Sequence, residues 1–172
     1  LFAFGAGLGA MIGRMTYRSS DLSYIAYIAP ALVAINIMYN AFFETTYASF
    51  VRMYYQKTYD AIAATPLSLE EVVTGDIAWG ATKAMIGTVI MVAVISVVGE
   101  LFFAPGLLSY PSSLILLPVA LIGGTAFAAL GMLFTAFVPG IINFNIPVFL
   151  FITPMFLFSG TFFPLENLPG WV

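Results

Sequence analysis

Long uncharged, apolar runs alternate with short polar stretches along this chain of 172 residues. No charged residue occurs in 22–43, 84–99 or 101–165, and Pro139-Gly140 divides the last of these runs. A helix that crosses a bilayer needs about 20 mostly apolar residues. The pattern predicts full spans at 22–43, 77–99, 113–138 and 141–163. It also predicts a partial span at 1–13, which we interpret as the second half of a helix in an internal piece of a longer protein.

The same runs predict helices rather than strands. A membrane β-barrel would show segments of about 10 residues with alternating polarity, and none occurs. Small residues recur at helical spacing, which lets backbones approach closely, although glycine is also simply common in membrane helices. The residues concerned are Gly5, Gly9, Gly13, Gly124, Ala128 and Gly131. We expect an all-α, polytopic bundle of transmembrane helices, with a polar loop at Arg14–Asp21.

The polar segment 44–76 begins as an amphipathic continuation of the span at 22–43. Nothing between Glu44 and Ala64 breaks a helix, and Arg52, Gln56 and Asp60 recur every four residues on one face. We therefore expect one unbroken helix that leaves the membrane and ends near Ala64.

A sharp corner is predicted at Thr65-Pro66, because the residue before a proline is pushed out of the helical conformation. Ser68 and Glu71 have the spacing of a capping box, so a second helix is expected to start near Leu69 and enter the next span. A solvated loop is the ordinary interpretation of such a charged connection. The helix–proline–helix arrangement instead favours a pair of helices on the membrane rim that contacts another protein.

Composition narrows the class of protein. Only 8% of the residues are charged and 62% are hydrophobic, whereas an ordinary soluble domain has roughly 25% charged residues. The chain has neither cysteine nor histidine, which excludes disulfides, thiolate or imidazole metal sites and Ser-His or Cys-His nucleophiles within it. The net charge of −3, without any basic run, gives no reason to expect a nucleic-acid partner.

Polar residues inside the spans are candidates for a translocation pathway, because intramembrane polar groups usually face protein or a cavity. Hydrogen bonds between helices are an equally good interpretation for Asn36 and Asn40. The predicted pathway residues are Asn36, Tyr39, Asn40, Phe43, Asn143 and Asn145.

The acidic residues suggest two other classes of function. Tyr59-Asp60 and Gly75-Asp76 superficially resemble the paired aspartates of intramembrane aspartyl proteases, but the second aspartate there follows Gly-x-Gly inside a span. An ion-coupled secondary transporter or channel would need a carboxylate deep in a span, and only Glu44 and Glu100 lie near span edges. Both remain alternatives to the function below.

Three stretches carry a resemblance to a known family. "YDAIAATPLSLEEVVTGDIAWGATKA" resembles the cytoplasmic linker of ABC-2 type transporter permeases. "TPMFLFSGTFFPLENLP" is similar to the same family's Ser-Gly-x-x-Phe-Pro…Leu-Pro segment, and "YIAYIAPALVAINIMYNAFFETTYASFVRM" to its second span. The resemblance covers essentially the whole chain and is closest to exporters of nodulation factors, polysaccharides or drugs.

The resemblance implies a type V exporter-like permease fold that is truncated at both ends, in a multi-pass protein of the inner (plasma) membrane. It implies a permease subunit, not an enzyme, that moves a lipid-linked sugar, polysaccharide or hydrophobic drug outward. The expected partners are an ABC nucleotide-binding subunit, a second permease copy or paralogue, and membrane lipids. The chain itself is expected to bind no cofactor and no metal, since the partner subunit would use ATP and Mg.

The resemblance also assigns residues. Segment 44–76 becomes the cytoplasmic coupling segment, and 159–172 an external re-entrant segment. The coupling residues are Asp60, Thr65, Pro66, Ser68, Glu70, Glu71 and Asp76. The re-entrant residues are Ser159, Gly160, Pro164 and Pro169. Asp60, Glu70 and Glu71 are the expected contacts to the ATPase, although acidic residues at a helix start also complement the helix dipole.

Overall fold

The computed structural model describes residue 7 and residues 14–17, 20–102 and 112–161. The predictions for Gly5, Gly9, Gly13, Pro164 and Pro169, and most of the partial span at 1–13, lie outside the described residues.

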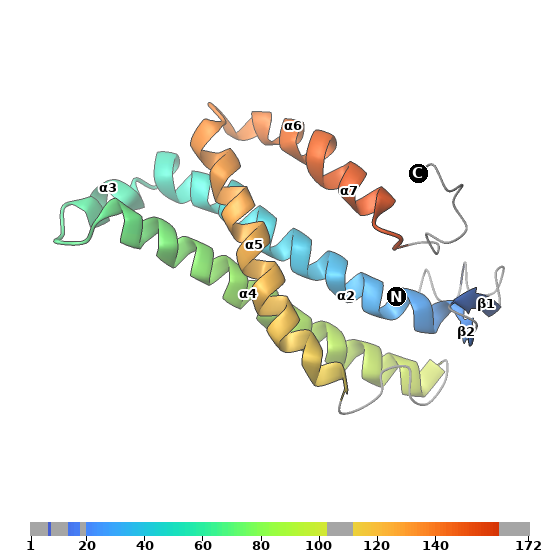
Figure 1. The fold of residues 1–172 in the computed structure, drawn as a ribbon. Coiled ribbons are helices and arrows are strands. Elements are labelled where there is room, and N and C mark those ends of the chain that lie inside the picture. Colours follow the sequence, from blue (N-terminus) through green and yellow to red (C-terminus); the bar gives the residue numbers. More distant parts are fainter. Residues whose placement is uncertain (1–6, 8–13, 18–19, 103–111, 162–172) are drawn as a thin grey trace.

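The described residues contain four helical segments that are long and apolar enough to cross a membrane (Figure 1). The first, Tyr24–Tyr55, joins α2 (Tyr24–Phe43) to two π-helical turns, η2 (Glu44–Ala48) and η3 (Val51–Tyr55). The second is α4 (Leu69–Phe102). The third, Ser113–Phe137, contains most of the 3-10 turn η4 (Ser112–Ile115) and all of α5 (Leu116–Phe137). The all-α, polytopic fold class is confirmed.

The fourth segment, Ile141–Phe158, changes its winding along its length. It runs through η5 (Ile141–Phe144, 3-10), α6 (Asn145–Pro147), η6 (Val148–Ile152, π) and α7 (Thr153–Phe158). Its start lies beside η2, where the buried Phe144 ring contacts Tyr47 of η2 and Phe50, which follows η2. Further along, Ile152 packs with Met38 and Phe42 of α2.

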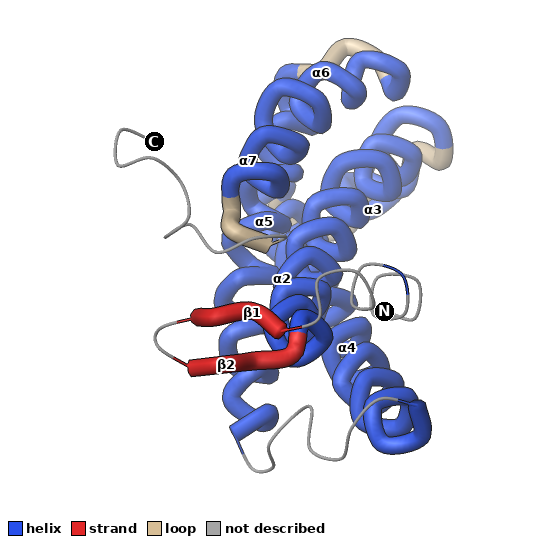
Figure 2. The backbone as a smooth tube through the Cα atoms, turned by 90° about the vertical axis from the view of Figure 1, so that its right-hand side faces the viewer, coloured by secondary structure: helices blue, strands red, loops and turns tan. Residues whose placement is uncertain are grey.

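A short β-hairpin stands where the sequence predicted only a polar loop. Arg14–Tyr17 (β1) pairs antiparallel with Ser20–Ser23 (β2), and Figure 2 shows the two strands at the start of α2. Thr16 and Tyr17 are residue types that favour strands, and the two strands are separated by a two-residue spacing typical of hairpins. Ser23 then caps α2, its Oγ accepting a hydrogen bond from the Ala26 amide at 3.3 Å.

Small residues bring α5 into close contact with α2 and α4, as the glycine pattern predicted. Gly124, Ala128 and Gly131 are all buried. A Cβ on Gly124 would lie 3.1 Å from the Cα of Ala81 in α4. These three residues form a stripe of small side chains on α5. One turn after this stripe, the Thr135 hydroxyl donates to the Thr45 carbonyl of the first segment at 2.8 Å. The stripe is therefore a packing surface.

The unbroken helix predicted from Glu44 to Ala64 is wrong at one point. Lys57 has φ 55 and ψ 26, in the left-handed region, and it separates η3 from the short helix α3 (Thr58–Ala63). The break turns the chain so that Tyr59 is buried and its hydroxyl meets Asp76 of α4. A tertiary contact therefore overrides the local helical pattern.

The predicted capping box at the start of α4 is confirmed. The Glu71 amide donates to Ser68 Oγ at 3.3 Å, and the Ser68 amide donates to Glu71 Oε2 at 2.7 Å. These bonds satisfy donors that a helix start leaves without partners. They fix where α4 begins after the Thr65-Pro66 corner.

The π turns of the first segment follow a cluster of hydroxyl residues. Thr45 Oγ1 donates to the Ala41 carbonyl at 3.1 Å, Thr46 Oγ1 to the Phe42 carbonyl at 2.7 Å, and Ser49 Oγ to the Glu44 carbonyl at 3.3 Å. Such side-chain bonds compete with the regular helical ladder and favour a local change of winding. Because π turns often occur at functional sites, they direct attention to Glu44–Tyr55.

Candidate coupling site and cavity

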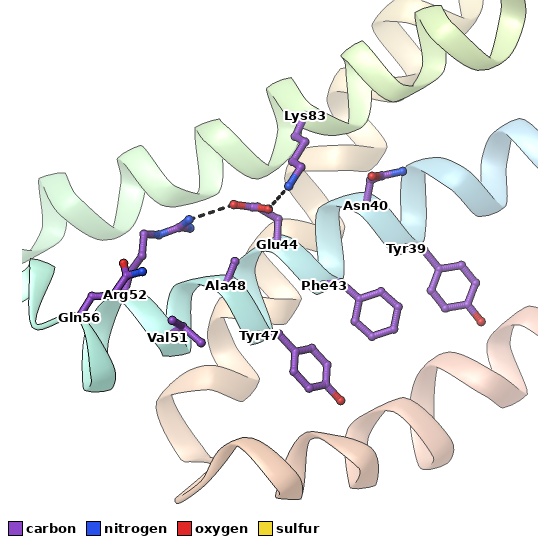
Figure 3. A pocket seen from close by; sticks show the side chains of 10 residues that line it. All are labelled: Tyr39, Asn40, Phe43, Glu44, Tyr47, Ala48, Val51, Arg52, Gln56 and Lys83. Carbon is purple, nitrogen blue, oxygen red and sulfur yellow. Dashed lines mark hydrogen bonds and ion pairs between the residues drawn. The ribbon is translucent and has the colours of Figure 1, made fainter.

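A buried carboxylate, Glu44, lies at the junction of α2 and η2. Its side chain is 6% exposed and accepts hydrogen bonds from three side chains. Arg52 Nη1 lies 3.0 Å and Trp79 Nε1 3.1 Å from Oε1, while Lys83 Nζ donates to Oε2. Figure 3 shows Arg52 and Lys83 converging on Glu44 from two directions. A charge removed from water in this way is tolerable only when it is paired and fully hydrogen-bonded.

Arg52 connects Glu44 to a second carboxylate. Its Nη2 lies 3.1 Å from Asp76 Oδ1 in α4 and 3.1 Å from Ser49 Oγ. The Tyr59 hydroxyl of α3 donates to the other oxygen of Asp76. Burial, and then the adjacent Asp76 carboxylate, raise the pKa of Tyr59, so the hydroxyl keeps its proton and remains a donor.

A cavity of 640 Å³ opens beside this cluster. One side of its wall carries charged and amide groups, and another carries a row of aromatic rings. Tyr39 and Phe43 are stacked at 5.4 Å between centroids, and Phe43 and Tyr47 lie 5.6 Å apart. In Figure 3 the three rings extend from α2 and η2 toward the fourth segment. The lining residues are Tyr39, Asn40, Phe43, Glu44, Tyr47, Ala48, Val51, Arg52, Gln56 and Lys83.

The structure brings only part of the predicted pathway set together. Tyr39, Asn40 and Phe43 line the 640 Å³ cavity. Asn36 lies at the contact with α4, where a Cβ on Gly87 would be 2.8 Å from its side-chain oxygen. The other two amides line separate cavities: Asn143 a largely apolar one of 490 Å³, and Asn145 one of 370 Å³. The pathway assignment remains a prediction.

The predicted coupling residues divide into two groups. Asp76 belongs to the charged cluster around Glu44, and Ser68 and Glu71, although exposed, form the helix cap. The others lie exposed at the α3–α4 corner: Asp60, Thr65, Pro66 and Glu70. Asp60 pairs with Lys57 at 3.6 Å, but both side chains are largely exposed, so this ion pair contributes little to stability. The exposed group is available for contact with another protein, and its role there stays a prediction.

The described part of the predicted re-entrant segment is Ser159–Thr161. Gly160 has φ 73, which glycine adopts without strain, and its carbonyl accepts a hydrogen bond from the Tyr27 hydroxyl of α2. Ser159 Oγ donates to the Phe156 carbonyl at 2.8 Å and so ends α7. The chain leaves α7 tied to the start of α2.

Sequence reasoning missed most of the charged cluster around Glu44. The sites predicted from the sequence contain Asp76 and omit the other members of the cluster, which are Glu44, Arg52, Tyr59, Trp79 and Lys83. Trp79 and Lys83 of α4 both donate to Glu44. One local signal was available, since Glu44 and Arg52 stand eight residues apart on one helical segment. The contacts to α4, which lie 35 and 39 residues away in the chain, have no local signal.

These features define a class: a polytopic helical membrane protein with a charged cluster at one end of its bundle and without a soluble domain among the described residues. The family model described as "ABC-2 type transporter" matches residues 2–172. The chain therefore belongs to the ABC-2 type transporter family, a family of membrane transport proteins.

The curated relatives agree with this assignment. Nodulation protein J of Sinorhizobium fredii is 41% identical over 169 residues, and that of Rhizobium meliloti is 41% identical over 171 residues. Nodulation protein J of Bradyrhizobium diazoefficiens is 35% identical over 170 residues. These matches cover 98%, 99% and 98% of this chain, but the chain spans only about 60% of the relatives' length. No solved structure gives a significant match.

Proposed function

We propose that this chain forms the core of the permease subunit of an ATP-driven exporter in the inner membrane. In this proposal the permease pairs with a second copy or a paralogue, and a separate nucleotide-binding subunit docks at the α3–α4 corner. The partner subunit binds and hydrolyses ATP with Mg²⁺, while this chain binds no cofactor. The cargo is an amphipathic molecule such as a lipid-linked sugar, a polysaccharide or a hydrophobic drug.

One observation carries the proposal. The α3–α4 corner presents an exposed acidic edge, while Tyr59 and Asp76 directly behind it are joined to the buried Glu44 cluster. A docking surface that moves a helical bundle needs an exposed contact face and a stiff connection to the spanning segments. The corner has both properties, and a plain connection between spans needs neither.

The alternatives find less support in the same residues. An ion-coupled carrier would use a buried carboxylate that gains and loses a proton, but Glu44 is held by two cations, Arg52 and Lys83. An aspartyl protease would bring its two carboxylates together. Asp60 instead pairs with Lys57 at the surface, whereas Asp76 pairs with Arg52.

The test is transport by the full-length permease reconstituted together with its ABC ATPase subunit. Inverted membrane vesicles should take up cargo with ATP, and a hydrolysis-deficient ATPase subunit should abolish uptake. Transport that continues with this inactive subunit and stops with a protonophore would instead support an ion-coupled carrier.

A charge reversal locates the docking face. Glu70→Lys changes an exposed residue at the corner and should weaken copurification of the ATPase subunit. Glu100→Lys changes an exposed acidic residue near the other end of the same helix and serves as the matched control. Equal copurification with both variants would remove the corner from the interface.

A further inference from the structure

Four side chains form a continuous chain of contacts from α3 to the cavity wall. Tyr59 of α3 donates to Asp76 of α4, Arg52 of η3 pairs with Asp76, and Arg52 also pairs with Glu44 of η2. We call these four residues the relay. Glu44 and Arg52 line the 640 Å³ cavity, so the relay joins this cavity to the short helix at the corner.

The position of α3 depends strongly on its relay residue. The helix has six residues, and Tyr59 is the buried one among them. The left-handed Lys57 on one side and the Thr65-Pro66 corner on the other separate α3 from the regular helices. Loss of the Tyr59–Asp76 bond would therefore release α3 while leaving the spanning segments packed.

At the cavity end of the relay, another anionic group can compete with Glu44 for its two cationic partners. Glu44 accepts from Arg52 and Lys83, and both cations also line the cavity. Lys83 is 48% exposed, so a group inside the cavity can reach it. An anionic or strongly accepting group there would compete with Glu44 for the two cations and change how Arg52 holds Asp76.

We infer that the relay couples the cavity to α3, so that α3 is released when an anionic group occupies the cavity. An anionic group in the cavity attracts Arg52 and Lys83, the Arg52–Asp76 pair weakens, and Tyr59 loses its fixed acceptor. Arg52, Asp76 and Tyr59 act as positioning residues in this step. The inference rests on the proposed function only in assuming that α3 is part of the interface with the ATPase subunit.

The absence of cysteine from residues 1–172 allows a direct test. Ala48 lines the cavity, and Ala48→Cys can carry a small sulfonate-bearing methanethiosulfonate adduct or a quaternary ammonium adduct of similar size. The full-length permease in lipid nanodiscs, with any cysteine outside this segment replaced, is then analysed by hydrogen–deuterium exchange. The amides of 58–63 should exchange about tenfold faster with the sulfonate adduct, the loss expected for one charge-assisted hydrogen bond, and at the unmodified rate with the ammonium adduct.

Two controls separate the relay from general disturbance. Glu100→Cys places the same sulfonate on an exposed position near the end of α4, far from the cavity along that helix, and should leave 58–63 unchanged. Tyr59→Phe should speed exchange of 58–63 without any adduct, and the sulfonate should then add no further effect. Tyr55→Phe, at a tyrosine that is 67% exposed, is the matched variant and should behave as the parent.

The exchange experiment decides the inference without the ATPase. Equal exchange with the two adducts, or a sulfonate effect that persists in Tyr59→Phe, would overturn it. The proposed function is judged separately, by copurification with the ATPase subunit. A response of 58–63 in a permease that binds no ATPase would preserve the relay and refute the exporter assignment.

Discussion

Replacing Gly131 by alanine tests the packing between α5 and α2 most directly. An added Cβ would lie 2.3 Å from Thr45 Oγ1, 2.9 Å from the Phe42 carbonyl oxygen and 3.3 Å from Thr46 Cγ2. The Thr45 side chain can rotate, but the Phe42 carbonyl belongs to the backbone of α2. The two helices must therefore separate by about half an ångström to restore ordinary contact.

The cost of this separation has two parts and one offset. Overpacking of this kind costs about 1–3 kcal/mol. The shift also lengthens the 2.8 Å hydrogen bond from Thr135 to the Thr45 carbonyl, and losing this bond would lower the free energy of unfolding by about 1 kcal/mol. Alanine is the better helix former by about 1 kcal/mol, which opposes both terms. The expected net loss for Gly131→Ala is about 1–3 kcal/mol.

The assay is thermal unfolding of the detergent-solubilised full-length protein at one scan rate, with two matched variants. Gly123→Ala lies in the same helix, and its Cβ would make an ordinary 3.6 Å contact with Ile37 Cγ2. Gly75→Ala has no neighbour within 4 Å and should gain about 1 kcal/mol from helix propensity alone. If Gly131→Ala unfolds at the same temperature as Gly123→Ala, the close approach of α5 to α2 is refuted.

Substitutions at three further positions test local features of the corner and the cluster. Ser68→Ala removes the cap of α4 and should cost about 1 kcal/mol, seen as faster amide exchange over 69–72; unchanged exchange there would argue against the capping box. Lys57→Gly should be tolerated because glycine accepts a positive φ, whereas Lys57→Val should cost about 1–2 kcal/mol in thermal unfolding; equal stability of the two would contradict the left-handed turn. Arg52→Met should cost about 2 kcal/mol of stability. This is less than for a fully buried pair, because Glu44 keeps Lys83 and Trp79 as partners. A variant as stable as the parent would show that Arg52 does not bridge Glu44 and Asp76.

Local and periodic signals made much of the fold predictable. The Ser68–Glu71 spacing located the start of α4, and the small residues at Gly124, Ala128 and Gly131 identified a packing face. Both features depend on residues within a few positions of one another, where the geometry of a helix fixes the outcome.

The features that escaped prediction depend on distant contacts. The break at Lys57 exists because Tyr59 turns back to Asp76, seventeen residues further on. The Glu44 cluster draws its donors from α4, and no periodicity within either helix contains that pairing. The π turns likewise follow from hydroxyl bonds to carbonyls that a pattern of apolar positions does not encode.

The winding of the first segment has a geometric consequence for its polar residues. Asn40, Glu44, Ala48, Arg52 and Gln56 stand four residues apart and all line one cavity. In a regular α-helix each such step would advance about 40° around the axis, and over four steps the row would curl away from any single neighbour. The wider turns at Glu44–Ala48 and Val51–Tyr55 slow this rotation and keep the row straight. If this segment tightened to regular α-helical winding, Arg52 would rotate away from Glu44 without any break in the backbone. A change in the number of residues per turn would therefore change the shape of this end of the molecule.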